Sequence, residues 1–266
     1  MGAFNGSFYS ESLGMNTRLA VIFPDESNDV TREIPGEPRV LYLLHGLSGN
    51  CEEWMRFSKI EYYAKKYNLI VIMPDAGRSF YCDLIGGPRY FTYVADELPA
   101  LCAKWFRIGA ARENTFIAGE SMGGYGAVKI ALRRPGRFSA AASLSGVLDY
   151  PAMAGRVLRG EWAEMHPQEL TALHGPDGVP VPEDNVLYLV RKLAERSDRP
   201  RLLQLCGTED FLYEDNQTFR RAADGAGYGH VYREGTGEHA WPYWDRAIQQ
   251  AIWFFLGLDE KTAVLY

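Results

Sequence analysis

The sequence lacks the features that mark several large classes of protein. It has only four cysteines among its 266 residues, and no two of them form the C-x-x-C pair of zinc and dithiol redox sites. It has no Walker-type phosphate loop, no H-E-x-x-H pair and no cluster of metal-ligand residues. We therefore expect a protein with no metal and no organic cofactor.

Long apolar runs and basic clusters are also missing. No run is long enough to cross a membrane, and the N-terminus lacks the basic start and apolar stretch of a secretory signal. The net charge is -6, with 28 Lys and Arg against 34 Asp and Glu. We therefore expect a cytoplasmic protein that binds neither nucleic acid nor membrane.

The length and the apolar content favour one α/β domain covering residues 1–266. A chain of 266 residues with 47% hydrophobic residues can bury a large core without disulfides. Cys102 and Cys206 lie in apolar runs and are expected to be buried thiols. Cys51 and Cys82 lie in predicted loops, where exposure is expected.

Extended segments alternate with helical ones along the chain. The predicted strands are residues 4–12, 16–23, 40–44, 69–73, 115–118, 139–144, 201–206 and 230–233. The predicted helices are residues 52–66, 93–106, 125–134, 213–226 and 241–256. This alternation predicts a mostly parallel, eight-stranded sheet with helices on both faces and an antiparallel pair at the N-terminus. Residues 146–199 interrupt the pattern with Pro, Gly and charge and two helices, 152–159 and 185–195, and indicate a lid-like insertion.

The chain is organised around Gly119-Glu120-Ser121-Met122-Gly123, which follows a strand and begins a helix. The pattern G-x-S-x-G in this context is typical of a nucleophile elbow, in which a sharp turn lifts the serine hydroxyl above the sheet. Glycines two residues to either side are needed because side chains there would collide with the neighbouring strand and helix. Taken alone, the same five residues also fit an ordinary glycine-rich turn.

Asp210 and His239 each follow a predicted strand, as Ser121 does. Because the carboxyl ends of parallel strands meet at one edge of a sheet, the three side chains are expected to lie together. The chain order Ser, Asp, His is that of α/β-hydrolases. Ser121 would then be the nucleophile, His239 its general base, and Asp210 the group that orients His239.

The other acids and histidines are expected to have structural roles or to face solvent. Glu209 is expected to point away from Asp210, and Glu214 and Asp215 to cap a helix. Asp75 and His45 follow strands but precede the nucleophile, and His45 fits a structural role in orienting the loop after its strand. The remaining histidines are expected to be solvated (His166 and His174) or to open a strand (His230).

Acyl transfer at a serine requires two preorganised donors for the oxyanion. The Met122 amide lies at the start of the helix that follows the serine, where the helix dipole favours negative charge. The Leu47 amide lies in the loop His45-Gly46-Leu47 after the strand at 40–44. We expect these two backbone amides to form an oxyanion hole.

Five segments together resemble one known family over nearly the whole chain. They are L-L-H-G-L-S-G (43–49), V-I-M-P-D (71–75), G-E-S-M-G-G-Y-G-A (119–127), C-G-T-E-D-F-L-Y (206–213) and G-E-H-A-W-P-Y-W (237–244). The chain resembles the esterase D family of serine hydrolases, and most of all its bacterial tributyrin esterases. The resemblance implies an α/β-hydrolase fold and a carboxylesterase for short acyl groups. It implies the triad Ser121, Asp210 and His239 and the oxyanion hole of Leu47 and Met122.

The resemblance leaves the substrate open, because the family also contains S-formylglutathione hydrolases, feruloyl and acetyl-xylan esterases, and mycolyltransferases. The formylglutathione branch commonly has a cysteine two residues after H-G-L, where this chain has Gly49, with Cys51 later. We therefore rank a short-chain, feruloyl or acetylated-sugar ester first. A formylglutathione-type thioester ranks second, and an acyltransferase with the same triad is a further hypothesis. A protein that binds a ligand on this fold without catalysing a reaction is the hypothesis outside the enzymes.

Aromatic residues near the predicted site are candidates for a pocket that binds a small ester. We name Tyr81, Tyr125, Trp162 and Trp244 as this pocket, with Trp241 as a further candidate, although each also fits the core. The family resemblance additionally allows a homo-oligomer.

Overall fold

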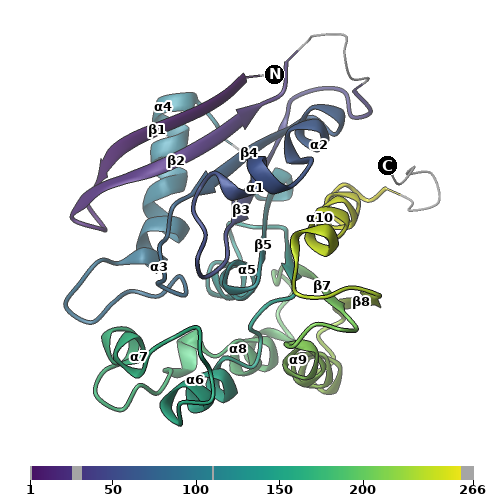
Figure 1. The fold of residues 1–266 in the computed structure, drawn as a ribbon. Helices are drawn as coiled ribbons and strands as arrows, with labels where there is room; N and C mark the ends of the chain where they lie inside the picture. Colours follow the sequence, from purple (N-terminus) through teal and green to yellow (C-terminus); the bar gives the residue numbers. More distant parts are fainter. Residues whose placement is uncertain (1, 26–31, 110, 259–266) are drawn as a thin grey trace.

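The structure, a computed structural model, describes residues 2–25, 32–109 and 111–258. Its centre is an eight-stranded sheet in the order β1-β2-β4-β3-β5-β6-β7-β8 (Figure 1). The strands are β1 (Gly2–Ser10), β2 (Met15–Phe23), β3 (Arg39–Leu44), β4 (Leu69–Pro74), β5 (Thr115–Glu120), β6 (Ala140–Leu144), β7 (Arg201–Gly207) and β8 (Val231–Gly235). β1 and β2 pair antiparallel and β2 meets β4 antiparallel, whereas all pairs from β4 to β8 are parallel. The predicted mostly parallel sheet is confirmed.

Helices cover both faces of this sheet. They are α1 (Glu53–Phe57), α2 (Ile60–Lys66), α3 (Tyr90–Thr92), α4 (Leu98–Phe106), α5 (Met122–Arg133), α6 (Tyr150–Leu158), α7 (Pro167–His174), α8 (Val186–Leu193), α9 (Tyr213–Gly225) and α10 (Trp241–Leu256). A π-helical turn, Tyr93–Glu97, joins α3 to α4, and 3-10 turns occur at Arg112–Asn114 and Pro182–Asp184. No helix among the described residues has the length and apolar character needed to cross a bilayer.

Alternate residues of the strands enter two separate cores, as the pleat of a strand requires. In β3, Leu41 and Leu43 pack with α1, α2 and α10 on one face. Val40, Tyr42 and Leu44 pack on the other face with α4, α5 and the helices that follow. The sheet is therefore buried on both sides, which explains why its parallel strands read as continuous apolar runs.

Two predicted helices differ in the structure. The helix expected at 52–66 is divided into α1 and α2, because Ser58 has an extended backbone and its hydroxyl bonds to the Trp54 carbonyl. The helix expected at 93–106 starts earlier, at Tyr90, and contains the π-helical turn.

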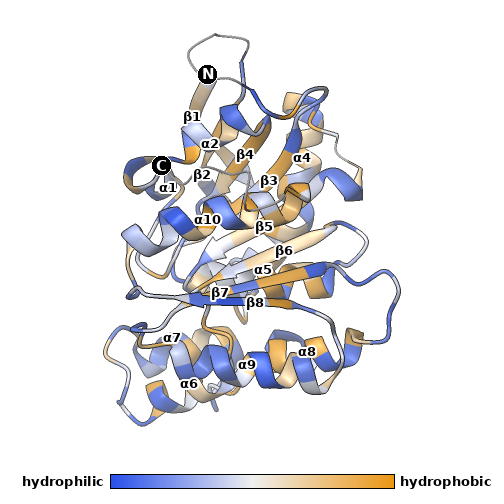
Figure 2. Ribbon diagram, turned by 90° about the vertical axis from the view of Figure 1, so that its right-hand side faces the viewer, coloured by the Kyte–Doolittle hydropathy of each residue, from blue (hydrophilic) through white to orange (hydrophobic). Residues whose placement is uncertain are grey.

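The segment 146–199 contains three helices where the sequence predicts two. The predicted helices correspond to α6 and α8, and α7 is additional. Pro167 at the first position of α7, and Glu169 accepting a hydrogen bond from the His166 amide at 2.9 Å, are the start signals that the prediction missed. In Figure 2, α6 to α9 form a layer below β7 and β8. Their apolar side chains join the core of that face.

Two expectations of exposure are wrong. Cys51 and Cys82 are buried like the other two thiols, Cys51 in the core beside α1 and Cys82 with its sulfur 2.9 Å from the Lys129 Nζ. The His174 side chain is also buried, with Nε2 2.8 Å from the Tyr150 hydroxyl. In each case the loop or insertion folds onto the sheet core instead of facing water.

One ring pair in the packing of α10 against the sheet can be tested. Phe116 of β5 and Phe255 of α10 stack with centroids 4.9 Å apart and planes within 5°, and both are buried. Phe116→Ala should lower the free energy of unfolding by about 3–5 kcal/mol, because a large cavity opens between helix and sheet. Urea titration measures this. Val179→Ala, at a side chain that is 60% exposed, is the matched control and should change it by less than about 0.5 kcal/mol.

Candidate active site

Ser121 lies at a strained turn between β5 and α5. Its backbone has φ 54° and ψ -120°, a conformation that a non-glycine residue rarely adopts. The turn is possible only because glycines flank it. A Cβ on Gly119 would lie 2.5 Å from the Gly123 carbonyl, and one on Gly123 would lie 2.5 Å from the Leu44 carbonyl oxygen. The steric reason expected for the two glycines therefore applies in the structure.

The loops that follow β5, β7 and β8 bring Ser121, Asp210 and His239 together, and His239 contacts both of the others. His239 Nε2 lies 3.0 Å from Ser121 Oγ. His239 Nδ1 lies 3.0 and 3.1 Å from the two carboxylate oxygens of Asp210. The Asp210 carboxylate is fully buried, and the His239 side chain is only 15% exposed. The arrangement can take a proton from the serine hydroxyl and stabilise the imidazolium that results.

The neighbouring acids are engaged elsewhere. Glu209 is exposed and accepts a hydrogen bond from the Gly237 amide at 2.5 Å, which ties the strand-end loop of β7 to the loop that carries His239. Asp215 pairs with Arg156 of α6. Asp210 is fixed in turn by the Leu212 amide, which donates to Oδ1 at 2.8 Å. Of the acids after β7, Asp210 is the one that lies against His239.

The two backbone amides expected to bind the oxyanion belong to separate elements that meet near Ser121. Met122 is the first residue of α5, so its amide is one of the helix N-terminal donors without an intrahelical acceptor. Leu47 lies in the loop after β3 and lines the same cavity as Ser121. The contact of Gly123 with the end of β3 holds this loop against the start of α5.

His45 supports the loop from inside the protein. It is 1% exposed; its Nε2 accepts a hydrogen bond from the Ala76 amide at 2.9 Å, and Nδ1 lies 2.7 Å from the Gly46 carbonyl oxygen. Burial lowers the pKa of His45, against smaller opposite effects of Gly46 and Asp75. The ring is therefore neutral, with its proton on Nδ1, which matches the structural role considered for it.

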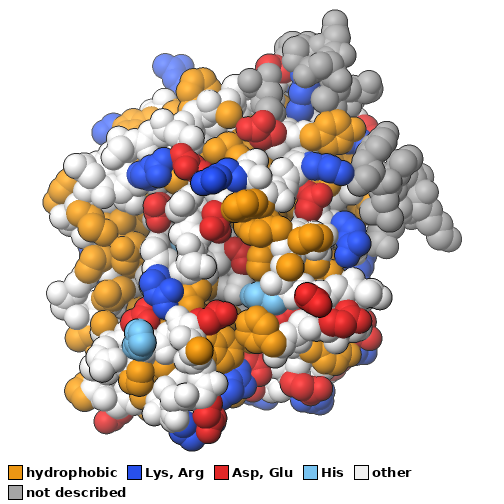
Figure 3. Space-filling view, viewed as in Figure 1, with side chains coloured by type: hydrophobic (Ala, Val, Ile, Leu, Met, Phe, Trp, Pro, Cys, Tyr) orange, Lys and Arg blue, Asp and Glu red, His pale blue; other side chains and the backbone are white. Residues whose placement is uncertain are grey.

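A cavity of about 480 Å³ opens beside Ser121. Its wall combines aromatic rings with carboxylates and the serine and histidine already described. The lining residues include Leu47, Glu53, Glu120, Glu164, Trp241 and Trp244. Figure 3 shows hydrophobic side chains and carboxylates around a hollow that has a histidine at its edge. The His239 ring is held between Trp244, 4.9 Å away edge-on, and Phe211, 4.5 Å away.

The pocket expected from the sequence needs correction. Trp244 and Trp241 line the cavity, but Tyr81 and Tyr125 are fully buried in the core. The Tyr81 hydroxyl donates to the His45 carbonyl at 2.9 Å, and the Tyr125 hydroxyl donates to the Asp184 carbonyl at 2.6 Å. They therefore support the site from beneath.

Trp162 lies near the cavity without lining it. Its ring contacts Phe211 at 5.6 Å and the Arg156 guanidinium at 5.1 Å. The sequence pattern did not indicate that Phe211 and Glu53 belong to this region. A place near the site could have been inferred for Phe211, because it directly follows Asp210 in the sequence.

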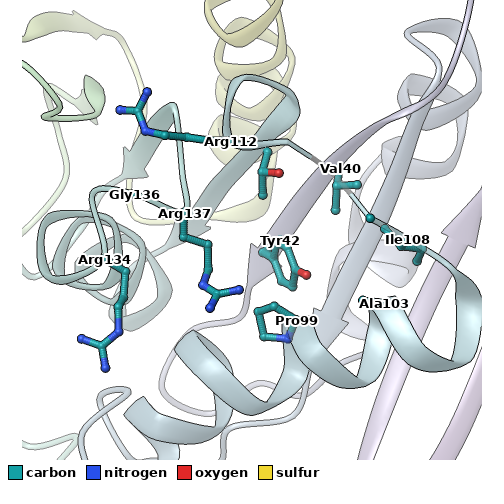
Figure 4. A pocket seen from close by; sticks show the side chains of 11 residues that line it. Val40, Tyr42, Pro99, Ala103, Ile108, Arg112, Arg134, Gly136 and Arg137 are labelled. Atoms are coloured by element: carbon teal, nitrogen blue, oxygen red, sulfur yellow. The ribbon is translucent and has the colours of Figure 1, made fainter.

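A second cavity, of about 450 Å³, lies away from this chemistry (Figure 4). It is lined by Val40 and Thr115 near the starts of β3 and β5, together with Arg112, Arg134 and Arg137. Ser121 follows the opposite end of β5, so this cavity is no part of the candidate site. Within the described ranges, no three His, Cys, Asp or Glu side chains are grouped closely enough to share a metal ion.

The structural role of His45 makes a prediction with a defined pH dependence. His45→Leu leaves the Ala76 amide and the Gly46 carbonyl unpaired, which should destabilise the fold by about 2–4 kcal/mol near pH 8. Below about pH 6.5 the unfolded wild-type imidazole binds a proton that the buried one does not. The wild type therefore loses stability as the pH falls, and the difference between the two proteins should shrink. Urea unfolding at pH 8 and pH 5.5 measures it, and a difference independent of pH would contradict this account.

Known proteins resemble this chain over most of its length. A family model described as "Putative esterase" matches residues 10–255. An acetyl esterase of Caldicellulosiruptor saccharolyticus is 32% identical over 258 residues, which cover 92% of this chain and 95% of the relative. The fluorophosphonate-binding serine hydrolase FphF of Staphylococcus aureus has a TM-score of 0.83 at 33% identity, covering 96% of this chain and 98% of that one. An S-formylglutathione hydrolase, FrmB, of the same organism has a TM-score of 0.82 at 32% identity, covering 96% and 98%.

These matches confirm the resemblance drawn from the five sequence segments and the α/β-hydrolase fold. They extend over nearly the whole length of both partners in each comparison. The chain belongs to the esterase family and is a carboxylic ester hydrolase.

Proposed function

We propose that this esterase hydrolyses short-chain acyl esters through an acyl-enzyme on Ser121. The observation that carries the proposal is the unbroken contact from Ser121 Oγ through both nitrogens of His239 to Asp210, with heavy-atom distances of 3.0 to 3.1 Å. In this assignment Ser121 attacks the ester carbonyl and His239 takes its proton. His239 then gives that proton to the departing alcohol. In the second half of the reaction His239 takes a proton from water, the water attacks the acyl-enzyme, and the acid leaves as Ser121 regains its proton.

The Leu47 and Met122 amides are the proposed oxyanion donors. Met122 begins α5, where the helix dipole favours negative charge, and Leu47 lines the same cavity as Ser121. Each donor of this kind contributes roughly 3–4 kcal/mol to transition-state stabilisation. The loop that carries Leu47 is fixed by His45 and Tyr81, which lowers the cost of aligning its amide.

The lining of the cavity favours an ester with a small acyl group and an alcohol that carries no negative charge. Trp241 and Trp244 supply flat apolar walls, while Glu53, Glu120 and Glu164 supply carboxyl groups. Of the described residues that line it, none is Lys or Arg. With Glu164 in this wall and no basic residue among those described, substrates that bear carboxylates, such as glutathione thioesters, are disfavoured. This favours a neutral ester, in agreement with the similarity to an acetyl esterase.

Residues 146–199 are proposed to act as the lid of this cavity. They provide Glu164 to its wall and place Trp162 against Phe211, which contacts His239. Arg78 ties this segment to the body of the protein by pairing with Glu169 at 2.7 Å. The insertion would thus shape the side on which the alcohol leaves.

The nucleophile can be tested directly. Ser121→Ala should lower kcat for p-nitrophenyl acetate by at least about 10⁴-fold, because no other group can form the acyl-enzyme. It should also abolish labelling by a fluorophosphonate probe. The matched control is Ser139→Ala, near the start of β6, whose hydroxyl lies 3.3 Å from the Glu113 carbonyl oxygen; it should retain both properties. Near-normal activity of Ser121→Ala would overturn the assignment.

The charge of the cavity separates esters from glutathione thioesters. The similarity to an S-formylglutathione hydrolase makes the thioesterase the second candidate function. If the acidic wall discriminates, Glu164→Lys should raise kcat/KM for S-formylglutathione relative to p-nitrophenyl acetate, and added salt should reduce the gain. A wild-type enzyme that already prefers the thioester at low salt would instead favour the second candidate.

A further inference from the structure

Two carboxyl groups lie beneath the loop that carries Leu47. Glu120 is the last residue of β5, next to Ser121, and is 2% exposed. An added Cβ on Gly46 would lie 2.5 and 2.6 Å from its two carboxyl oxygens. Glu53, the first residue of α1, lies in the same way against Gly49. The two acids therefore bracket residues 46–49 and line the cavity together with Ser121.

Their surroundings disfavour charge. The pKa of Glu120 is raised to about 8, chiefly by burial and next by the nearby Glu53, while the Gly46 backbone partly offsets the rise. Burial also raises the pKa of Glu53, against a smaller effect of Arg56. The other titratable groups around the loop are His45 and Tyr81 beneath it, Asp75 beside His45, Arg56 near Glu53, and Glu164 and His239 across the cavity. The charge of Glu120 raises the pKa of Tyr81. The Glu120 carboxyl therefore remains protonated at neutral pH.

Protonation of Glu120 matters because of where the oxyanion forms. A neutral acid can stay packed against the Gly46 backbone without opposing the negative charge that develops beside Leu47 and Met122. A carboxylate at the same place, one residue before Ser121, would repel that charge through the protein interior. It would also draw water beneath the loop and shift the Leu47 amide.

We propose that Glu120 is a positioning residue: in its acid form it holds residues 46–47 beneath the acyl carbonyl, and its ionisation switches hydrolysis off at alkaline pH. Glu53 is its partner in this pair and keeps the second half of the loop in place. The inference rests on the proposed function of Ser121 and adds a regulatory group that takes part in no bond making.

The test is the pH profile of kcat for p-nitrophenyl acetate, corrected for spontaneous hydrolysis, between pH 6 and 10. The wild type should lose activity above about pH 8 by roughly tenfold per pH unit, since one proton is lost. Glu120→Gln keeps the shape of the side chain but cannot ionise. It should retain enough activity at neutral pH for a full profile and show no alkaline decline relative to its own value at pH 7. Glu120→Ala should lower kcat by about 100-fold with little change in KM, because the loop loses its support beneath one oxyanion donor.

A matched control and a second readout separate this role from mere structure. Glu52→Gln removes a neighbouring carboxyl that pairs with Arg18 on the surface and should leave the alkaline decline unchanged. Circular dichroism should show that Glu120→Gln is folded at every pH used. An alkaline decline that persists in folded Glu120→Gln would overturn the inference, while loss of activity in Ser121→Ala would still uphold the proposed function.

Discussion

The close approach of α5 to the end of β3 is the constraint on which the site depends. Gly123 lies so near the Leu44 and His45 carbonyls that any side chain there would force the two elements apart. This contact places the strained Ser121 turn beside the loop of Leu47. The sheet then supplies Asp210 and His239 from strand ends on the same edge. The local packing of a backbone thus defines where chemistry can occur.

Beneath that contact, the loop of residues 45–49 is held by polar groups that carry no charge. His45 is buried as a neutral ring bonded to Ala76 and Gly46. Glu120 lies under Gly46 in an environment that favours its acid form. Neutral polar groups can hold a loop in place by hydrogen bonds and packing. They do not oppose the negative charge that develops on an oxyanion beside the loop. Asp210 contacts the histidine from the far side of the imidazole.

The sequence predicts the parts of this arrangement that follow from chain order and strand ends. Ser121, Asp210 and His239 could be placed together because each follows a parallel strand, and the structure brings them within hydrogen-bond distance. Tyr81 and Tyr125 could not be assigned, because an aromatic residue near a site fits the core as well as the pocket, and here both are core. Glu53 was missed because its place beneath Gly49 depends on how α1 packs across the strand ends.

The same reasoning explains why substrate choice is the least predictable property. The groups proposed to carry out chemistry lie in loops at the ends of the strands. Glu164 and Trp162 instead come from residues 146–199. That segment is irregular in sequence and contains α7, a helix that the pattern did not predict. Apolar side chains anchor this segment to the core of one face, so its polar side chains can vary without disturbing the elbow. Relatives with the same sheet and different insertions can therefore share one mechanism and act on different esters.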